Sequence, residues 1–186
     1  MDELALYVLD ITMNSVRAGA TEISVTLRED GEWLWFTVTD NGCGMTEEQL
    51  KRLTDPFFTT RTTRKVGLGI PFLKMLAEMT GGTLTVTSVS ETVSEEHGTT
   101  IEAKFGRHHL DFIPIGDMTE TVKTLIQGSP DVNFTFEHRT ENGTVSLSCA
   151  ELRAMLGDEI SLAEPEIIRW IGDYLTEQYA ELGASE

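Results

Sequence analysis

Three polar side chains near the start of the chain could act together on one ligand. Asp10, Asn14 and Arg17 belong to a predicted helix over residues 3–18, and at 3.6 residues per turn they fall within about 60° of one another. The amide oxygen of an asparagine suits Mg²⁺, an arginine can hold a phosphate, and a carboxylate can orient or deprotonate a nucleophile. The alternative is a solvated polar stripe on a surface helix.

The segment Asp40–Met45 combines a carboxylate with two glycines. Asp40 keeps the alternation of the predicted strand 34–38, so its carboxylate points toward the buried side of a sheet, where it requires a hydrogen-bond donor. One interpretation is a carboxylate that accepts from an amino group, such as that of adenine, while Gly42 and Gly44 let the backbone approach a flat ring. The alternative is an aspartate that caps a glycine turn.

Two segments farther along could contact phosphate. The predicted loop 54–66 contains Phe57-Phe58-Thr59-Thr60-Arg61 and gathers three of the 14 Lys and Arg residues between positions 61 and 65. Gly67-Leu68-Gly69 opens a predicted helix over 69–79, and free N–H groups at a helix start attract phosphate. The Walker and Rossmann patterns are excluded, because no Lys-Ser/Thr follows these glycines and no strand precedes them.

A threonine near the end of this region completes the candidate set. Thr99 shares the parity of Ile101, Ala103 and Phe105 in a predicted strand, so its hydroxyl points to the same buried side as Asp40. Two inward polar groups can satisfy one edge of a buried ligand.

Hydrophobic periodicity predicts the elements that position these residues. Residues 1–106 alternate between helical and strand patterns, and helices on one face of a mainly antiparallel sheet give an α+β sandwich. The expected order is a helix over 3–18, strands at 23–27 and 34–38, helices over 46–53 and 69–79, and strands at 84–86 and 101–105. Residues 107–186 form a smaller α+β extension of unassigned role, with helices over 118–127, 150–156 and 165–181 and a hairpin pairing 132–137 with 144–148.

Composition limits the partners of the chain. With 14 Lys and Arg against 31 Asp and Glu, the 186 residues carry a net charge of −17, which argues against nonspecific nucleic-acid binding and against an anionic membrane surface. No run of eighteen apolar residues and no positively charged signal start is present. Cys43 and Cys149 are interpreted as two reduced thiols. Because thiols stay reduced in the cytosol, this interpretation predicts a cytoplasmic protein.

Taken in order, these motifs resemble the GHKL ATP-binding superfamily of gyrase, MutL mismatch-repair ATPases, histidine kinases and anti-sigma-factor kinases. The resemblance covers about residues 3–105 and implies the Bergerat ATP-binding fold. It implies that Asn14 coordinates Mg²⁺, that Asp40 binds the adenine amino group with Thr99 beside it, and that Arg17 and Arg61 contact phosphates. It further implies nucleotide binding by Gly42, Gly44, Met45, Phe58, Thr59, Thr60, Gly67, Leu68 and Gly69.

The resemblance implies ATP and Mg²⁺ as ligands and leaves two functions open. The first is a phosphotransfer enzyme or slow ATPase, in which Asp10 acts on the nucleophile and a partner protein supplies the phosphoacceptor. The second is a non-catalytic ATP-dependent switch, favoured by Asp10, since many ATPase members carry Glu there. No helical phosphoacceptor module is expected, because none of the four histidines lies in a recognisable acceptor helix. A dimer is possible.

Overall fold

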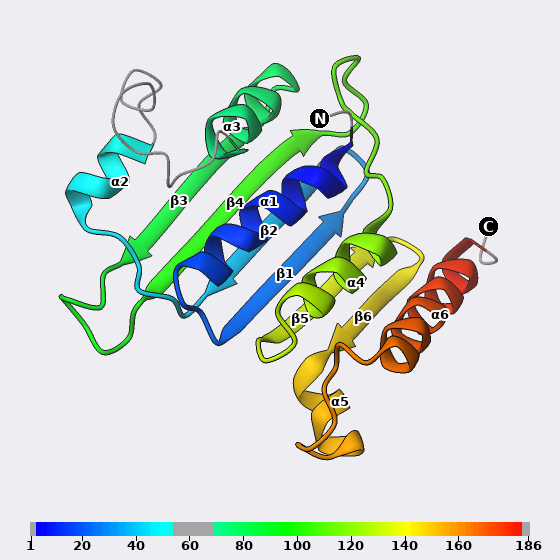
Figure 1. The fold of residues 1–186 in the computed structure, drawn as a ribbon. Coiled ribbons are helices and arrows are strands. Elements are labelled where there is room, and N and C mark those ends of the chain that lie inside the picture. Colours follow the sequence, from blue (N-terminus) through cyan, green and yellow to red (C-terminus); the bar gives the residue numbers. More distant parts are fainter. Residues whose placement is uncertain (1–2, 54–68, 184–186) are drawn as a thin grey trace.

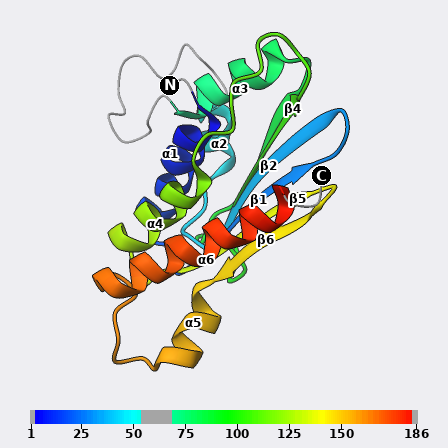
Figure 2. The ribbon, with the colours of Figure 1, turned by 90° about the vertical axis from the view of Figure 1, so that its right-hand side faces the viewer.

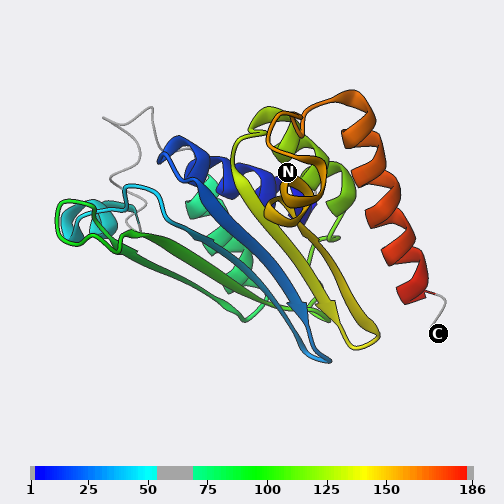
Figure 3. The same ribbon diagram turned by 90° about the horizontal axis from the view of Figure 1, so that it is seen from below.

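The computed structural model describes residues 3–53 and 69–183. Its strands form one six-stranded sheet in the order β3-β4-β2-β1-β5-β6 (Figure 1). Figure 2 and Figure 3 show α1, α3, α4 and α6 on one side of this sheet, and no helix of the described residues covers the opposite face. The elements are α1 (Leu4–Arg17), β1 (Glu22–Glu29), β2 (Trp33–Asp40), α2 (Glu47–Leu53), α3 (Gly69–Met79), β3 (Thr83–Val89), β4 (Gly98–Gly106), α4 (Met118–Gly128), β5 (Asn133–Thr140), β6 (Gly143–Ser148), α5 (Cys149–Leu156) and α6 (Pro165–Gly183).

The alternation of apolar and polar residues determines which face of the sheet the helices cover. Successive side chains of a strand point to opposite faces, so every second residue of β1 and β2 faces the helices. These inward residues are almost fully buried: Ile23, Val25, Leu27, Leu34, Phe36 and Val38. Val8 and Ile11 of α1, which are completely buried, belong to the same core. The N-terminal helix is thereby fixed over the strands that carry the candidate site.

The predicted α+β class, a mainly antiparallel sheet with helices on one face, is confirmed. The predicted helix 69–79 coincides with α3, and the predicted C-terminal hairpin is the β5–β6 pair. Across residues 3–53 and 69–183, no helix combines the length and the apolar character that a membrane span requires.

The strands that follow residue 107 continue the same sheet. β5 lies parallel to β1, with Glu22 opposite Asn133 and Arg28 opposite Arg139, and β6 pairs with the far side of β5. α6 packs on β6 and α4. Residues of both predicted segments, 1–106 and 107–186, therefore contribute to one sheet and one core, while their division into two domains stays a prediction.

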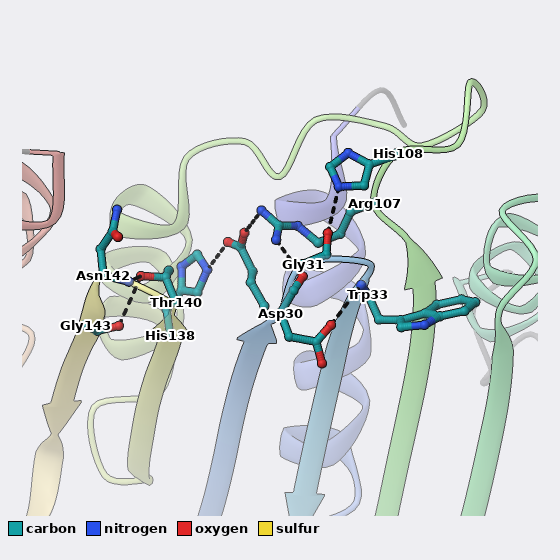
Figure 4. A network of polar contacts seen from close by, with 10 residues as sticks. Asp30, Gly31, Trp33, Arg107, His108, His138, Thr140, Asn142 and Gly143 are labelled. Atoms are coloured by element: carbon teal, nitrogen blue, oxygen red, sulfur yellow. Dashed lines mark hydrogen bonds and ion pairs between the residues drawn. The ribbon is translucent and has the colours of Figure 1, made fainter. Parts of the chain in front are cut away.

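A largely buried polar network connects β5 to β1 (Figure 4), and a side chain of α6 joins it. His138, 4% exposed, donates from Nε2 to Glu29 Oε1 at 2.6 Å, and its Nδ1 hydrogen-bonds with the Tyr179 hydroxyl at 2.8 Å. Arg107 pairs with the other carboxylate oxygen of Glu29 at 2.5 Å. The hydrogen bond from His138 lowers the pKa of Glu29, and the charges of His138 and Arg107 add to this against the opposing effect of burial. Burial also raises the pKa of Tyr179.

Glu29 should make the stability of the fold depend on pH in the acidic range. A carboxyl whose pKa is lowered by folding stabilises the protein above its unfolded pKa of 4.5, and this contribution is lost as the pH falls through the lower folded pKa. Urea denaturation at pH values from neutral to about 3 should therefore show the stability difference between wild type and Glu29→Gln shrinking below the unfolded pKa. Glu32→Gln, at the exposed β1–β2 turn, is the matched control and should follow wild type. A difference that stays constant with pH contradicts this role for Glu29.

Candidate functional site

A cavity of about 270 Å³ opens between α1, α2, the start of α3, the end of β2 and the start of β4. This volume lies just below the range for small-molecule sites, roughly 300–1,000 Å³. Apolar side chains form one part of the wall and polar groups gather at the other. The lining consists of Asn14, Ser15, Arg17, Ala18, Asp40, Cys43, Gly44, Met45, Gln49, Leu53, Ile70, Thr99 and Ile101. Six predicted site residues thus meet at one cavity: Asn14, Arg17, Asp40, Gly44, Met45 and Thr99.

Asp40 ends β2 and is held by three donors. Its Oδ2 accepts from the Ser15 hydroxyl at 2.6 Å, and its Oδ1 accepts from the backbone N–H groups of Gly42 at 2.9 Å and Thr99 at 3.2 Å. A carboxylate offers about four lone-pair positions, so these donors leave capacity for one more. The carboxylate is therefore fixed in place and can still accept from a ligand at the cavity wall.

The two predicted pocket glycines are required by close packing. A Cβ on Gly42 would lie 2.9 Å from both Cβ and the carbonyl oxygen of Ala18. Gly44 has φ +66°, and a Cβ there would overlap the carbonyl of Val89. Because only glycine fits both positions without strain, the segment after Asp40 can lie flat between α1 and the end of β3.

Asn14 and Arg17 face each other on the last turn of α1. Arg17 donates from a terminal guanidinium nitrogen to Asn14 Oδ1 at 2.9 Å. The Nδ2 of Asn14 is buried and has no hydrogen-bond partner among the described residues. A buried amide donor without a partner is costly, so an acceptor that enters the cavity would be favoured here. The amide oxygen, the group expected to bind Mg²⁺, already accepts from a cation, and a metal at this atom requires the Arg17 side chain to turn away.

Asp10 lies one turn earlier and contacts the start of α3. A Cβ on Gly69 would overlap the Asp10 carboxylate, so glycine at this position lets the carboxylate reach the helix N-terminus. The positive end of a helix dipole favours a carboxylate in that position. Asp10 does not line the cavity described above, although Gly69, which it touches, directly precedes the lining residue Ile70.

Several predicted residues lie outside the described part of the chain. They are Phe58, Thr59, Thr60, Arg61, Gly67 and Leu68. Their predicted contacts with phosphate stay predictions.

A family model identifies this arrangement. The model described as histidine kinase-, DNA gyrase B-, and HSP90-like ATPase matches residues 2–109, more than half of the chain. The chain belongs to this ATPase family. The match begins before α1 and ends after β4, so it contains every residue that lines the cavity. The predicted membership of the GHKL superfamily is confirmed.

Relatives of this ATPase-family chain include a sensor histidine kinase and a sporulation kinase. It is 34% identical to the sensor histidine kinase ZraS of Escherichia coli O157:H7 over 90 residues, which are 47% of this chain and 19% of ZraS. It is 30% identical to sporulation kinase B of Bacillus subtilis over 105 residues, 55% of this chain and 23% of that kinase. The chain thus matches less than a quarter of the length of either kinase.

A solved structure shows the same fold. The ATPase domain of Aquifex aeolicus MutL in complex with ADP superposes with a TM-score of 0.55 at 17% sequence identity, covering 80% of this chain and 63% of that domain. The match extends well past residue 109, so part of the region after β4 also follows the fold of the MutL domain. The predicted Bergerat fold is confirmed.

Two serines of the site are absent from the sequence-based set. Ser15 donates to Asp40, and Ser88 of β3 accepts from the backbone N–H of Met45 at 2.8 Å and bonds the Thr99 hydroxyl at 2.7 Å. Ser15 lies four residues after the core residue Ile11, so helical periodicity could have indicated a buried hydroxyl. Ser88 shares the parity of Leu84 and Val86, which places it on the inward face of β3.

Proposed function

We propose that the chain binds ATP with Mg²⁺ in the cavity at the end of α1 and transfers or releases the γ-phosphate. The observation that carries the proposal is Asp40, a carboxylate held by three donors with one acceptor position left, at the wall of a partly apolar cavity. Membership of the ATPase family supports it, as does the nucleotide in the MutL structure. The described residues suit a flat heterocycle that presents an amino group.

The adenine ring would be recognised by one polar edge and held by apolar walls. Asp40 accepts from the exocyclic amino group, while Ile70, Ile101 and Met45 cover the faces of the ring. Guanine presents a carbonyl oxygen at the same ring position, so the carboxylate would meet an acceptor instead of a donor. Rejection of guanine therefore follows from a half-buried carboxylate that faces another acceptor at its remaining position.

The phosphates would extend toward the last turn of α1. Arg17 supplies a guanidinium and Asn14 a free amide donor and an amide oxygen, so the two side chains can share phosphate and metal once Arg17 releases the oxygen. Mg²⁺ held there would neutralise charge on the phosphate oxygens. Asp10 takes the proton of the attacking group while that group forms a bond to the γ-phosphorus. The bond between the γ-phosphorus and the bridging oxygen breaks, and ADP leaves with that oxygen. The attacking group is a partner's side chain or water.

The second candidate is a nucleotide-dependent switch without catalysis. The contact between Asp10 and Gly69 favours it, because a carboxylate engaged at a helix N-terminus is less available as a base. In this version ATP changes the surface that the chain offers to a protein partner. The kinase relatives extend far beyond the matched region, so the partner and phosphoacceptor of this chain belong to the proposal in either version.

Asn14→Ala tests whether this side chain binds the complex of ATP with Mg²⁺. We expect calorimetry to show ATP affinity in the presence of Mg²⁺ falling by roughly tenfold or more, since charge-assisted and metal contacts to one side chain contribute on the order of 1.5–3 kcal/mol. The gain in affinity on adding Mg²⁺ should shrink as well. Asn142→Ala, in the exposed β5–β6 turn, is the matched control and should bind as wild type does. A wild-type protein with no affinity for ATP contradicts the proposed function outright.

The fate of radiolabelled γ-phosphate decides between the two candidates. Wild-type protein incubated with labelled ATP and Mg²⁺ for hours should release phosphate or label a partner protein if it is an enzyme. Tight binding with the label retained in ATP, with and without candidate partners, supports the switch.

A further inference from the structure

An apolar groove runs along the edge of the molecule on the side opposite α6. It encloses about 290 Å³ between α3, the end of α2 and β3. Leu53, Ile70, Phe72, Met75 and Leu84 contribute its apolar surface, and we call it the α3–β3 groove. Phe72 is 42% exposed and Met75 50%, and Met79, one turn farther along the same helix face, is 46% exposed. Three large apolar side chains at this spacing form a stripe that the described residues do not cover.

The groove adjoins a sheet edge with no strand beside it. Among the described residues, β3 pairs only with β4, so alternate backbone N–H and C=O groups of β3 point away from the sheet (Figure 1). Such an edge can accept another strand through main-chain hydrogen bonds, while a neighbouring apolar groove receives side chains. The sequence of β3, Thr-Leu-Thr-Val-Thr-Ser-Val, contains no charge and no proline that would oppose this.

The opposite sheet edge, formed by β6, is partly occupied by a side chain of α6. Gln178 of α6 accepts from the backbone N–H of Ser146 in β6 at 3.0 Å and donates to the carbonyl of the same residue at 3.0 Å. This amide takes both outward hydrogen bonds of Ser146, one of the six residues of β6, and α6 also packs on this strand. The two edges of the sheet therefore differ, and β3 is the edge available for strand addition.

The distribution of charge indicates which partner can bind the α3–β3 groove. The chain carries a net charge of −17, so two copies repel each other over most of their surface. In the α3–β3 groove the charged lining residues are Lys74 and Glu78, which pair at 3.9 Å and leave the groove neutral. Two identical apolar, neutral surfaces complement each other without a charged counterpart, which is the condition for an isologous interface.

We propose that the chain forms a two-fold symmetric dimer in which β3 of one copy pairs antiparallel with β3 of the other. A two-fold axis perpendicular to the sheet, midway between the Val86 residues of the two copies, sets Thr85 opposite Thr87 of the second copy and keeps the helices of both copies on the same face. Phe72, Met75 and Met79 of the two α3 helices then meet above the joined strands. The result is a continuous twelve-stranded sheet with a shared apolar layer.

Sedimentation equilibrium without nucleotide tests the dimer. Over about 5–200 µM, a range that brackets micromolar association, wild type should approach twice the chain mass of 20.7 kDa. Met75→Glu should weaken self-association at least tenfold, because it adds a charge to both sides of the seam. Met155→Glu, the same change at a 72% exposed methionine of α5, should associate as wild type does. Wild type that stays monomeric throughout, or equal weakening by both variants, overturns the proposal.

A cysteine pair tests the register. In a Cys43→Ser background, which removes the exposed thiol, Val86→Cys should form a disulfide-linked dimer under mild oxidation. Directly opposed residues of antiparallel strands have Cβ atoms about 4.5–5.5 Å apart, and a small backbone shift brings them to the roughly 3.5–4.5 Å of a disulfide. Thr83→Cys lies near the end of β3, far from its symmetry mate, and should not cross-link. Equal cross-linking of the two variants, or none from Val86→Cys, rejects this pairing. Since no nucleotide is present, neither experiment depends on the proposed function.

Discussion

Asp40→Asn is expected to weaken ATP binding by about 10²-fold, on the order of 3 kcal/mol, and to abolish preference for ATP over GTP. Asparagine keeps the shape of aspartate and one acceptor oxygen, which can serve the two backbone N–H groups of Gly42 and Thr99. The amide nitrogen then replaces the oxygen next to Ser15, whose hydroxyl can rotate and accept. The local fold should survive, while the adenine amino group meets a donor in place of an acceptor.

Calorimetry with ATP and GTP on wild type and the variant measures this effect. Asp173→Asn, at an exposed position of α6, controls for the loss of one negative charge and should leave both affinities unchanged. Thermal denaturation should show Asp40→Asn folded at the temperature of the assay. Equal affinity of wild type for the two nucleotides, or unchanged ATP affinity of Asp40→Asn, would show that this carboxylate does not read adenine.

The positions of the helices and strands follow from local sequence patterns, whereas the order in which the strands pair in the sheet does not. Alternation in β1 and β2 and the glycines around α3 fix strand and helix positions, because side-chain periodicity depends only on nearby residues. The parallel pairing of β1 with β5 joins segments about a hundred residues apart. The alternation within one strand indicates which of its faces is buried, but it does not indicate which other strand pairs with it. The pairing of β1 with β5 could therefore not be derived from alternation.

The candidate site shows the same division. Motif order predicted that Asn14, Asp40 and Thr99 come together, and all three line the cavity. Their hydrogen-bond partners Ser15 and Ser88 were not predicted, because serine is common and its role here depends on tertiary contacts. The contact between Asp10 and Gly69 likewise links residues from two helices, and only the packing of α1 on α3 creates it.

Asp10→Ala is expected to lower phosphate release or transfer by roughly 10²–10⁴ and to leave ATP affinity within a few-fold. A group that takes a proton from the nucleophile acts in the transition state, so its removal need not change binding of the ground-state nucleotide. Turnover of labelled ATP and calorimetry on the same preparations separate the two quantities. The effect should be absent in Asp173→Asn, which again controls for charge.

Two further substitutions distinguish a base from a packing residue, since Asp10 also touches the start of α3. Asp10→Asn keeps the size of the side chain beside Gly69 and removes its basicity, so it should be as slow as Asp10→Ala if the carboxylate takes the proton. Retained turnover in Asp10→Asn would instead assign Asp10 to positioning α3. Asp10→Glu restores the acid usual among ATPase members, but its extra methylene must fit where even a Cβ on residue 69 would overlap the carboxylate. A gain in hydrolysis from Asp10→Glu would mean that the shorter acid keeps the protein slow, and full activity of Asp10→Ala would return Asp10 to a structural role.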